Sequence, residues 1–121
     1  MSASADLAAR RFSVVIVNYN GGQMLLDCVR SVRSGLLPAD RMIVVDNGSR
    51  DDSMARLEAA EPGCVILHNG CNAGFARAVN RGLAQVCSEF ALLLNNDARL
   101  APDAWDALAA AFDTLPRAAF L

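Results

Sequence analysis

An acidic residue follows a short apolar run late in the chain, where it could hold a divalent metal ion. Leu92-Leu93-Leu94 is followed directly by Asn95-Asn96-Asp97. Mg²⁺ and Mn²⁺ prefer oxygen ligands, commonly one or two carboxylates together with phosphate oxygens. Since all eleven basic residues are Arg and no P-loop is present, Asp97 is the candidate for neutralising a diphosphate through such an ion. Read alone, Asn-Asn-Asp fits a turn better than a metal site.

Three earlier apolar runs also end in polar clusters. Residues 13–17 precede Asn18-Tyr19-Asn20, residues 42–45 precede Asp46, and residues 64–67 precede His68. Tyr19 could stack on a base or cover the edge of the core, and Asp46 could contact a ligand or open an Asx turn. His68, the only histidine, has no matching nucleophile in the sequence and is interpreted as structural.

These runs alternate with helical patterns and predict a β-α-β-α-β-α-β-α order. The helices are expected from after Gly21-Gly22 to about residue 34, from 50 to about 60, over roughly 73–87 and from about 102 to 115, before Pro116. Short, almost wholly apolar strands favour a Rossmann-like three-layer α/β/α fold with a mainly parallel sheet, in strand order 3-2-1-4. In that order Asn18 to Asn20 would face Asn96 and Asp97 across a crevice, with Asp46 at the neighbouring strand end.

Local patterns add expectations about packing. Ser49 and Asp52 have the S-x-x-D spacing that predicts Ser49 as a helix cap. Gly74 either permits close backbone approach or simply begins the third helix. Apolar spacing predicts that the following side chains face the sheet: Met24, Leu25, Cys28, Val29 and Val32 in the first helix, Phe75, Val79, Leu83 and Val86 in the third, and Trp105, Leu108 and Phe112 in the fourth.

Composition narrows the function classes. The chain has 121 residues, is 54% hydrophobic and 20% charged, and carries a net charge of −2, which favours a packed domain. Its Arg residues form no basic run, so nucleic acid is not an expected partner. The four cysteines match no zinc spacing and are expected to be buried, reduced thiols. No apolar stretch approaches the roughly 20 residues of a membrane helix.

The ends of the chain suggest how the domain is bounded. Residues 1–11 are expected to be a loose leader, and residues 12–121 one domain. Residues 117–121 look like the start of another strand, which predicts an amino-terminal half truncated at the carboxyl end; a short natural tail is the alternative. A bare sheet edge there could pair with a second copy, so a homodimer stays open.

Four motifs together resemble family 2 glycosyltransferases with the GT-A fold, especially the bacterial rhamnosyltransferase-like subgroup. The resemblance covers nearly everything from Phe12 to Leu121 and lies in residues 14–20, residues 44–49, residues 72–75 with 78–82, and residues 93–97. It implies the amino-terminal, donor-binding portion of an enzyme for inverting transfer of a sugar. The donor would be a nucleoside-diphosphate sugar, and the acceptor a glycan or lipid-linked molecule in cell-surface polysaccharide biosynthesis. The expected location is the cytoplasm or the inner face of the membrane.

The same resemblance implies roles for individual residues. Asn18, Tyr19 and Asn20 would border the nucleoside pocket, Asp46 would accept a hydrogen bond from the base, and Gly74 belongs to a donor-binding motif. Asn96 and Asp97 occupy the family's Asp-x-Asp position, with Asp97 as the ligand of Mg²⁺ or Mn²⁺. Asn at 95 and 96 departs from the acidic pattern. No residue is a candidate for the general base, so the catalytic residue is left unassigned.

Two other classes fit less well. A non-catalytic nucleotide-binding or regulatory module on a doubly wound scaffold remains the alternative, although a phospho-acceptor receiver domain would need a Lys that the chain lacks. Nucleotidyl transfer would want a basic, glycine-rich loop after the first strand, and Asn18-Tyr19-Asn20-Gly21-Gly22 has no basic residue. The sequence does not indicate the sugar, the base or the acceptor.

Overall fold

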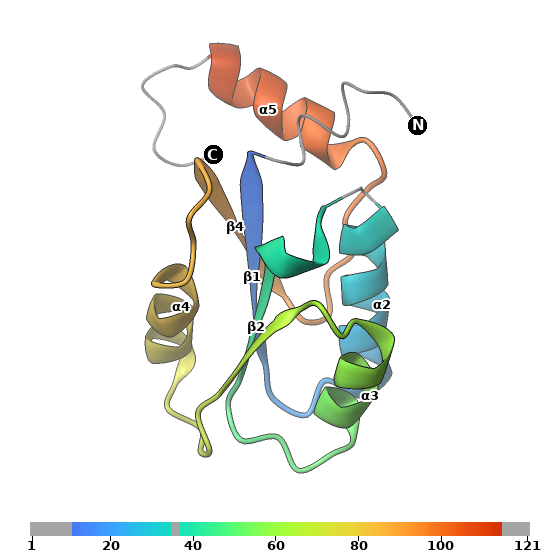
Figure 1. Ribbon diagram of the computed structural model, residues 1–121, viewed down its shortest axis with the longest axis vertical. Coiled ribbons are helices and arrows are strands. Elements are labelled where there is room, and N and C mark those ends of the chain that lie inside the picture. The colour runs from blue at the N-terminus through green and yellow to red at the C-terminus, as the bar shows by residue number, and fades with distance from the viewer. Residues whose placement is uncertain (1–10, 35–36, 115–121) are drawn as a thin grey trace.

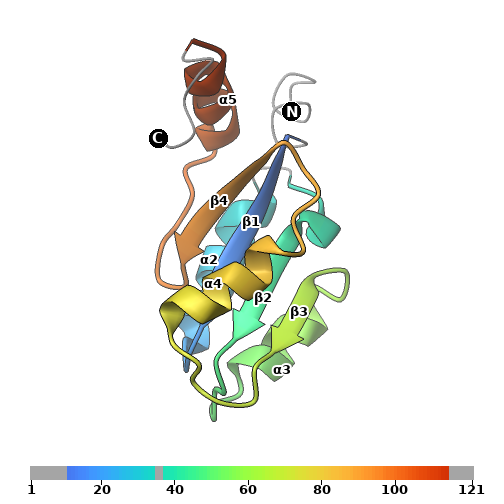
Figure 2. The same ribbon diagram turned by 90° about the vertical axis from the view of Figure 1, so that its left-hand side faces the viewer.

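A four-stranded parallel sheet forms the centre of the molecule (Figures 1 and 2). The computed structural model describes residues 11–34 and 37–114. Within these residues the strands lie in the order β3-β2-β1-β4, and all three pairings are parallel. The predicted strand order 3-2-1-4 is therefore confirmed. The strand bounds are β1 Phe12–Asn18, β2 Met42–Asp46, β3 Val65–His68 and β4 Phe90–Asn95.

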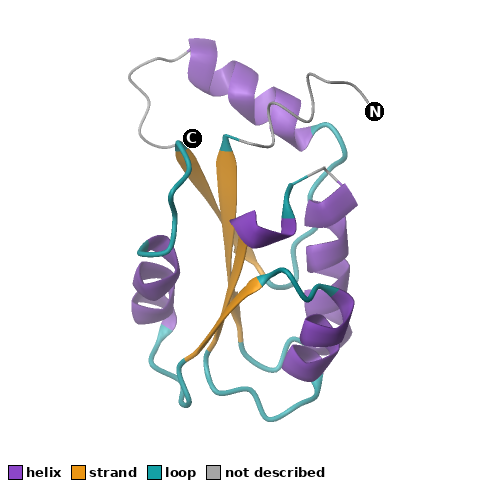
Figure 3. Cartoon of the chain, in the orientation of Figure 1, coloured by secondary structure: helices purple, strands orange, loops and turns teal. Residues whose placement is uncertain are grey.

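Helices cover the two faces of the sheet unequally (Figure 3). Helices α2 (Gly22–Ser34) and α3 (Ser53–Ala60) lie on one face, and α4 (Phe75–Leu83) lies on the other. Helix α5 (Ala104–Thr114) crosses the end of the sheet where β1 begins, and a short 3₁₀ helix (Ala39–Arg41) leads into β2. The predicted three-layer α/β/α arrangement is present, with the α4 layer the thinner one.

The larger core lies between the sheet and helices α2, α3 and α5. It contains Ile16, Leu25 and Val44, each fully buried. Aromatic side chains close the α5 end, where the ring centroids of Phe12 and Trp105 are 5.1 Å apart. Trp105 is buried and Leu108 and Phe112 pack against the same core, so the inward face predicted for this helix is confirmed.

Helices α3 and α4 differ in extent from those expected. Helix α3 begins at Ser53, with Asp52 as its N-cap residue, so the prediction that Ser49 caps it is wrong. The reason is that the Ser49 hydroxyl donates a hydrogen bond to the Asp46 carboxylate instead, at 2.6 Å. Helix α4 is also shorter than predicted. Its N-cap is Gly74 at φ 89°, a left-handed conformation that cannot continue a helix toward residue 73.

Three side chains expected to face the sheet are exposed. Met24 is 54% exposed, Phe75 60% and Leu83 37%. Phe75 and Leu83 lie at the two ends of α4, the one helix packed on its face of the sheet within the described residues, so little covers them. The remaining inward positions of the two helices are buried or partly buried, as predicted: Leu25, Cys28, Val29 and Val32 in α2, Val79 in α4, and Val86 just after it.

The cysteines only partly match the expectation of buried thiols. All four are free; Cys28 is buried and Cys64 partly buried, whereas Cys71 and Cys87 are exposed. None of the helices in the described part of the chain combines the length and apolar character that a membrane span needs. The expectations for residues 1–10 of the leader, Pro116 and residues 117–121 lie outside the described residues.

Candidate functional site

The carboxyl ends of β1, β2 and β4 meet at one end of the sheet, and Asn18 joins all three. Its side-chain nitrogen donates to Asp46 Oδ1 at 3.3 Å, and its oxygen accepts a hydrogen bond from Asn96 Nδ2 at 3.1 Å. Strand β1 pairs with β2 on one side and β4 on the other, so its last residue lies between the two neighbouring strand ends. Asn18 and Asn96 are therefore close together, as predicted, but a direct hydrogen bond joins the two side chains in place of the crevice expected between them.

The loop after β2 is held by the carboxylate of Asp46. Asp46 is 5% exposed and accepts hydrogen bonds from the backbone N–H of Ser49, at 3.1 Å, and from its hydroxyl. These bonds, together with the one from Asn18, satisfy the buried carboxylate within the protein. Asp46 thus shapes the loop over residues 47–49.

The loop after β1 is tied to the same segment. Asn20, at φ 49°, donates its backbone N–H to Ser49 Oγ at 2.8 Å, and its side-chain oxygen accepts from the N–H of Arg50 at 2.8 Å. Asn is one of the few residues that tolerate this left-handed conformation. Nearby, Asp51 accepts from the Gly22 N–H and from the Ser53 hydroxyl. The Ser53 hydrogen bond is the main reason that the pKa of Asp51 is lowered below its usual value.

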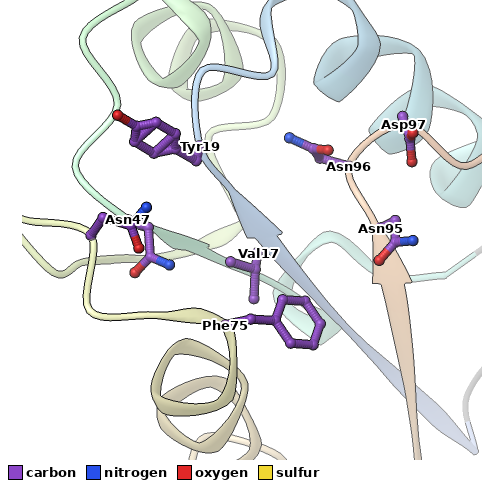
Figure 4. A pocket seen from close by; sticks show the side chains of 8 residues that line it. Val17, Tyr19, Asn47, Phe75, Asn95, Asn96 and Asp97 are labelled. Carbon is purple, nitrogen blue, oxygen red and sulfur yellow. The ribbon is translucent and has the colours of Figure 1, made fainter.

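A cavity of about 380 Å³ opens beside these loops (Figure 4). It lies between the end of β1, the loop after β2, the start of α4 and the turn after β4. Figure 4 shows Tyr19 and Asn47 on one side of the opening, Phe75 and Val17 below it, and the turn after β4 on the other side. The residues that line it are Val17, Tyr19, Asn47, Asn72, Phe75, Asn95, Asn96 and Asp97.

Aromatic and amide groups form one side of this cavity. Tyr19 is 47% and Phe75 60% exposed, so both rings are accessible to a flat ligand. Asn47 is almost fully buried and is held by Asn69, whose Nδ2 donates to Asn47 Oδ1 at 2.7 Å. A fixed amide beside two accessible rings is suited to binding a planar heterocycle that carries donors and acceptors.

The turn over residues 95–97 forms the opposite side of the cavity. Side chains of helix α2 hydrogen-bond to the backbone at the first residue of this turn and just after it. Cys28 Sγ donates to the backbone oxygen of Asn95 at 3.5 Å, and Ser31 Oγ accepts from the backbone N–H of Leu100 at 2.9 Å. Burial and the nearby charge of Asp97 raise the pKa of the Cys28 thiol to about 11, so it stays neutral. The loop therefore has a firm base on α2.

Asp97 itself is exposed, and within the described residues its carboxylate forms no hydrogen bond or ion pair. Other acidic groups near the site are already engaged: Asp46 with Ser49, and Asp51 with Ser53. Asp97 is thus the lining carboxylate that is available to a ligand. Within residues 11–34 and 37–114, no cluster of three or more His, Cys, Asp or Glu side chains could hold a metal ion by protein groups alone.

The structure separates the predicted site residues into two sets. Tyr19, Asn96 and Asp97 line the cavity. The others lie around it without lining it and act through hydrogen bonds within the protein: Asn18, Asn20, Asp46 and Gly74, whose carbonyl accepts from Asn47 Nδ2 at 3.4 Å. His68 lies apart from the cavity, 3.6 Å from the Glu58 carboxylate, and both side chains are exposed.

Sequence reasoning missed five lining residues: Val17, Asn47, Asn72, Phe75 and Asn95. Asn47 follows Asp46 at a strand end, so the pattern that singled out Asp46 could equally have singled out its neighbour. The spacing of Phe75 fits the inward face of α4 and so predicts a core position. No pattern within a single helix indicates that its first turn extends past the covered part of a sheet.

Comparison with known proteins places this chain in a family. Residues 13–121 match the family model described as glycosyl transferase family 2. A curated relative, N-acetylglucosaminyl-diphospho-decaprenol L-rhamnosyltransferase of Mycobacterium tuberculosis, is 29% identical in a 119-residue alignment that covers 89% of this chain and 39% of the relative. The chain spans 27% to 39% of the length of the curated relatives that it matches.

Solved structures agree on the fold. TarS of S. aureus, residues 1–349 in complex with UDP-GlcNAc, superposes with a TM-score of 0.76 at 23% identity, covering 86% of this chain and 31% of that one. The mannosyltransferase PcManGT of Pyrobaculum calidifontis, in complex with GDP-Man and Mn²⁺, superposes with a TM-score of 0.69 at 22% identity, covering 82% and 31%. These neighbours are GT-A glycosyltransferases, and this chain has the amino-terminal half of that fold.

Strand order, the position of the cavity and the extent of the sequence match are consistent with one another, and the chain belongs to glycosyl transferase family 2.

Proposed function

We propose that the cavity binds a nucleoside-diphosphate sugar and that the chain is the donor-binding portion of an inverting glycosyltransferase. The observation that carries this proposal is the pairing of two accessible aromatic rings with a lining carboxylate that no group among the described residues neutralises. A nucleotide sugar has a flat base at one end and a charged diphosphate farther along. The cavity matches this arrangement, since one side has aromatic rings and the other side has the Asp97 carboxylate.

The base would lie on the side of Tyr19 and Phe75. Stacking on aromatic side chains binds any nucleobase because every base has a π-face. The Asn47 amide, buried beside these rings, has a second N–H that could bond to a base carbonyl. Asn47 is a better candidate than Asp46 for this contact, since Asp46 does not line the cavity and its oxygens are occupied by Ser49 and Asn18.

The diphosphate would lie against the turn over residues 95–97. Asp97 offers a carboxylate, and Asn95 and Asn96 offer amide oxygens, so the donor set consists of oxygen atoms and fits Mg²⁺ or Mn²⁺. One carboxylate is too little charge for a site made by protein alone, so phosphate oxygens and water would have to complete it. When bound, such an ion would stabilise the negative charge on the departing diphosphate.

The proposed transfer is a single displacement. The acceptor hydroxyl oxygen forms a bond to the anomeric carbon, the bond from that carbon to the phosphate oxygen breaks, and the diphosphate leaves with the electron pair. A general base must remove the proton of the hydroxyl. No group in the described residues is assigned to this role. The contribution of this chain is to bind and orient the donor through Tyr19, Asn47 and Asp97.

The relatives support the ligand class. TarS is described with UDP-GlcNAc and PcManGT with GDP-Man and Mn²⁺, and the mycobacterial relative is named for transfer of rhamnose to a lipid-linked sugar. By analogy, the acceptor here would be a glycan or a lipid-linked glycan of the cell surface. The reaction would then take place in the cytoplasm or at the inner face of the membrane.

A thermal-shift panel tests the proposal. UDP, dTDP, GDP and the corresponding nucleosides are added to the chain with Mn²⁺, with Mg²⁺ and with EDTA. At least one diphosphate is expected to raise the Tm in the presence of the metal ion and to raise it less in EDTA. If no nucleotide changes the Tm under any condition, a nucleotide-sugar site is excluded. An equal Tm shift with the metal ion and with EDTA would support donor binding but would show that binding does not depend on a metal ion.

A further inference from the structure

The side-chain amide of Asn18 is completely buried, yet it lies next to the turn over residues 95–97, where the metal ion is proposed to bind. We call this segment the metal turn. Asn18 is 0% exposed, so it cannot touch a ligand in the cavity. Its oxygen nevertheless accepts from Asn96 Nδ2 at 3.1 Å, and Asn96 precedes Asp97 directly. Any influence of Asn18 on a bound cation must therefore act through Asn96.

The orientation of the Asn18 amide follows from its acceptor neighbours. Its nitrogen lies 3.3 Å from Asp46 Oδ1, an oxygen that can only accept. It also lies 3.2 Å from Ser49 Oγ and 3.0 Å from Ser53 Oγ. Both hydroxyl groups donate elsewhere, Ser49 to Asp46 and Ser53 to Asp51, so they too present lone pairs to Asn18. The NH₂ group of Asn18 must point toward this cluster.

With its nitrogen fixed, Asn18 presents its oxygen to the other side. That oxygen accepts from the Gly21 backbone N–H at 3.2 Å and from Asn96 Nδ2. Because only the NH₂ group of Asn96 can donate, the Asn96 amide is also fixed in one of its two flipped orientations. Figure 4 shows the result: the nitrogen of Asn96 is directed away from the β4 turn, and its oxygen lies on the side of Asp97.

Gly21 makes this contact geometrically possible. A Cβ at position 21 would lie 2.4 Å from Asn18 Oδ1 and 2.7 Å from Asn96 Nδ2. Both distances are shorter than any real Cβ contact, and the atoms met belong to the hydrogen bond itself. The loop after β1 therefore leaves open the space in which Asn18 and Asn96 meet.

We propose that Asn18 is a positioning residue that turns the Asn96 carbonyl oxygen toward Asp97, so that amide and carboxylate together present two oxygen ligands to the cation. This inference rests on the proposed function, because it concerns the metal turn of the same cavity. In this proposal the hydrogen-bonded residues act in sequence: Asp46 orients Asn18, Asn18 orients Asn96, and the Asn96 oxygen supplements the Asp97 carboxylate. The amide oxygen supplies the second ligand where a second acidic residue is missing.

Two substitutions at position 18 separate positioning from simple packing. Asn18→Leu keeps the size of the side chain but removes the acceptor, so the Asn96 amide is free to flip. Asn18→Asp keeps an acceptor toward Asn96 but loses the donor toward Asp46 and brings two carboxylates together. Both variants should lower the Tm. Only Asn18→Leu should weaken Mn²⁺ binding.

Mn²⁺ affinity is read from the electron paramagnetic resonance signal of free Mn²⁺, titrated into the chain with the diphosphate that gives the largest thermal shift. Loss of an outer partner of a metal ligand lowers metal affinity by about 10- to 100-fold, which is the expected effect of Asn18→Leu. Asn18→Asp should retain an affinity close to that of the wild type. Ser13→Ala is the matched control. It removes a partly buried hydrogen bond, between Ser13 and Ser88 at 2.7 Å, near the opposite end of the same strand, and should leave Mn²⁺ affinity unchanged.

Equal Mn²⁺ affinity in the wild type and Asn18→Leu would overturn the inference, as would equal losses in Asn18→Leu and Asn18→Asp. If Asn18→Leu does not fold, Gly21→Ala takes its place, because it pushes the same two amides apart without replacing either; unchanged affinity in that variant would overturn the inference as well. A wild-type chain that binds neither diphosphate nor Mn²⁺ would instead refute the proposed function, and the inference with it.

Discussion

Gly82 of helix α4 lies directly against Val15 of strand β1: a Cβ at position 82 would be 2.5 Å from Val15 Cγ1 and 3.1 Å from Val45 Cγ2. The helix can approach the sheet this closely only because position 82 has no side chain. Since α4 carries Phe75 into the cavity, the same close packing determines where that ring lies.

Gly82→Ala should therefore destabilise the protein even though Ala favours helices. Replacing Gly by Ala in a helix gains about 1 kcal/mol. Overpacking against two stiff, β-branched side chains costs about 1–3 kcal/mol, and the severe overlap with Val15 places this case toward the upper end. We expect a net loss of about 1 kcal/mol or more in urea unfolding. Ala76→Ser, on the exposed face of the same helix, should change stability little; a stabilised Gly82→Ala would show that α4 does not pack as described.

Phe75→Ala should impair ligand binding while leaving the fold intact. The ring is 60% exposed, so its removal costs little burial. If it stacks on the base, its loss should weaken binding by about 1 kcal/mol or more, roughly fivefold in Kd. Calorimetric titration of the diphosphate measures the effect. Met24→Ala, which removes another exposed apolar side chain away from the cavity, is the control, and equal affinities in all three proteins would remove Phe75 from the site.

Protonation of Asp51 should lower the stability of the folded protein at acid pH. Hydrogen bonds from Ser53 and Gly22 favour the charged carboxylate, so its pKa is lower in the folded chain than in the unfolded one. The resulting stabilisation is fully present above the ordinary pKa of Asp and is lost as pH falls through the lowered value. The Tm difference between the wild type and Asp51→Asn should therefore shrink below about pH 4. A difference that stays constant down to pH 2 would contradict this assignment; Asp103→Asn serves as an exposed control.

The cysteines should differ sharply in reactivity. Cys28 is fully buried, and burial together with the charge of Asp97 raises its pKa to about 11, whereas Cys71 and Cys87 are exposed. Because the thiolate is the reactive form, iodoacetamide at neutral pH should label Cys71 and Cys87 and spare Cys28. Peptide mass spectrometry reports the sites. Rapid labelling of Cys28 would mean that the turn over residues 95–97 is not held on α2.

Much of the fold could be predicted from the sequence because strands and helices leave strong periodic patterns. Four apolar runs separated by amphipathic segments led to the parallel sheet and its order 3-2-1-4. Right-handed crossovers leave few ways of arranging such units. The same argument placed Asn18, Asp46 and Asn96 at one end of the sheet, where hydrogen bonds now join them.

Finer features depended on choices that a single sequence does not reveal. Ser49 has the spacing of a helix cap, yet its hydroxyl bonds to Asp46, because a buried carboxylate needs partners more than an exposed helix end does. Phe75 has the spacing of a core residue, yet it is exposed, because the first turn of α4 extends beyond the part of the sheet that the helix covers. Both differences arise from tertiary contacts that local patterns do not encode.

Asp97 is proposed to hold a cation, and that cation in turn to bind a diphosphate. The most direct measurement is calorimetric titration of a nucleoside diphosphate into the wild type and Asp97→Asn, each with Mn²⁺ and with EDTA. We predict that Mn²⁺ strengthens binding at least about tenfold in the wild type and has little effect in Asp97→Asn, with Asp103→Asn behaving as the wild type. Equal enhancement by Mn²⁺ in the wild type and Asp97→Asn would show that Asp97 does not hold the cation.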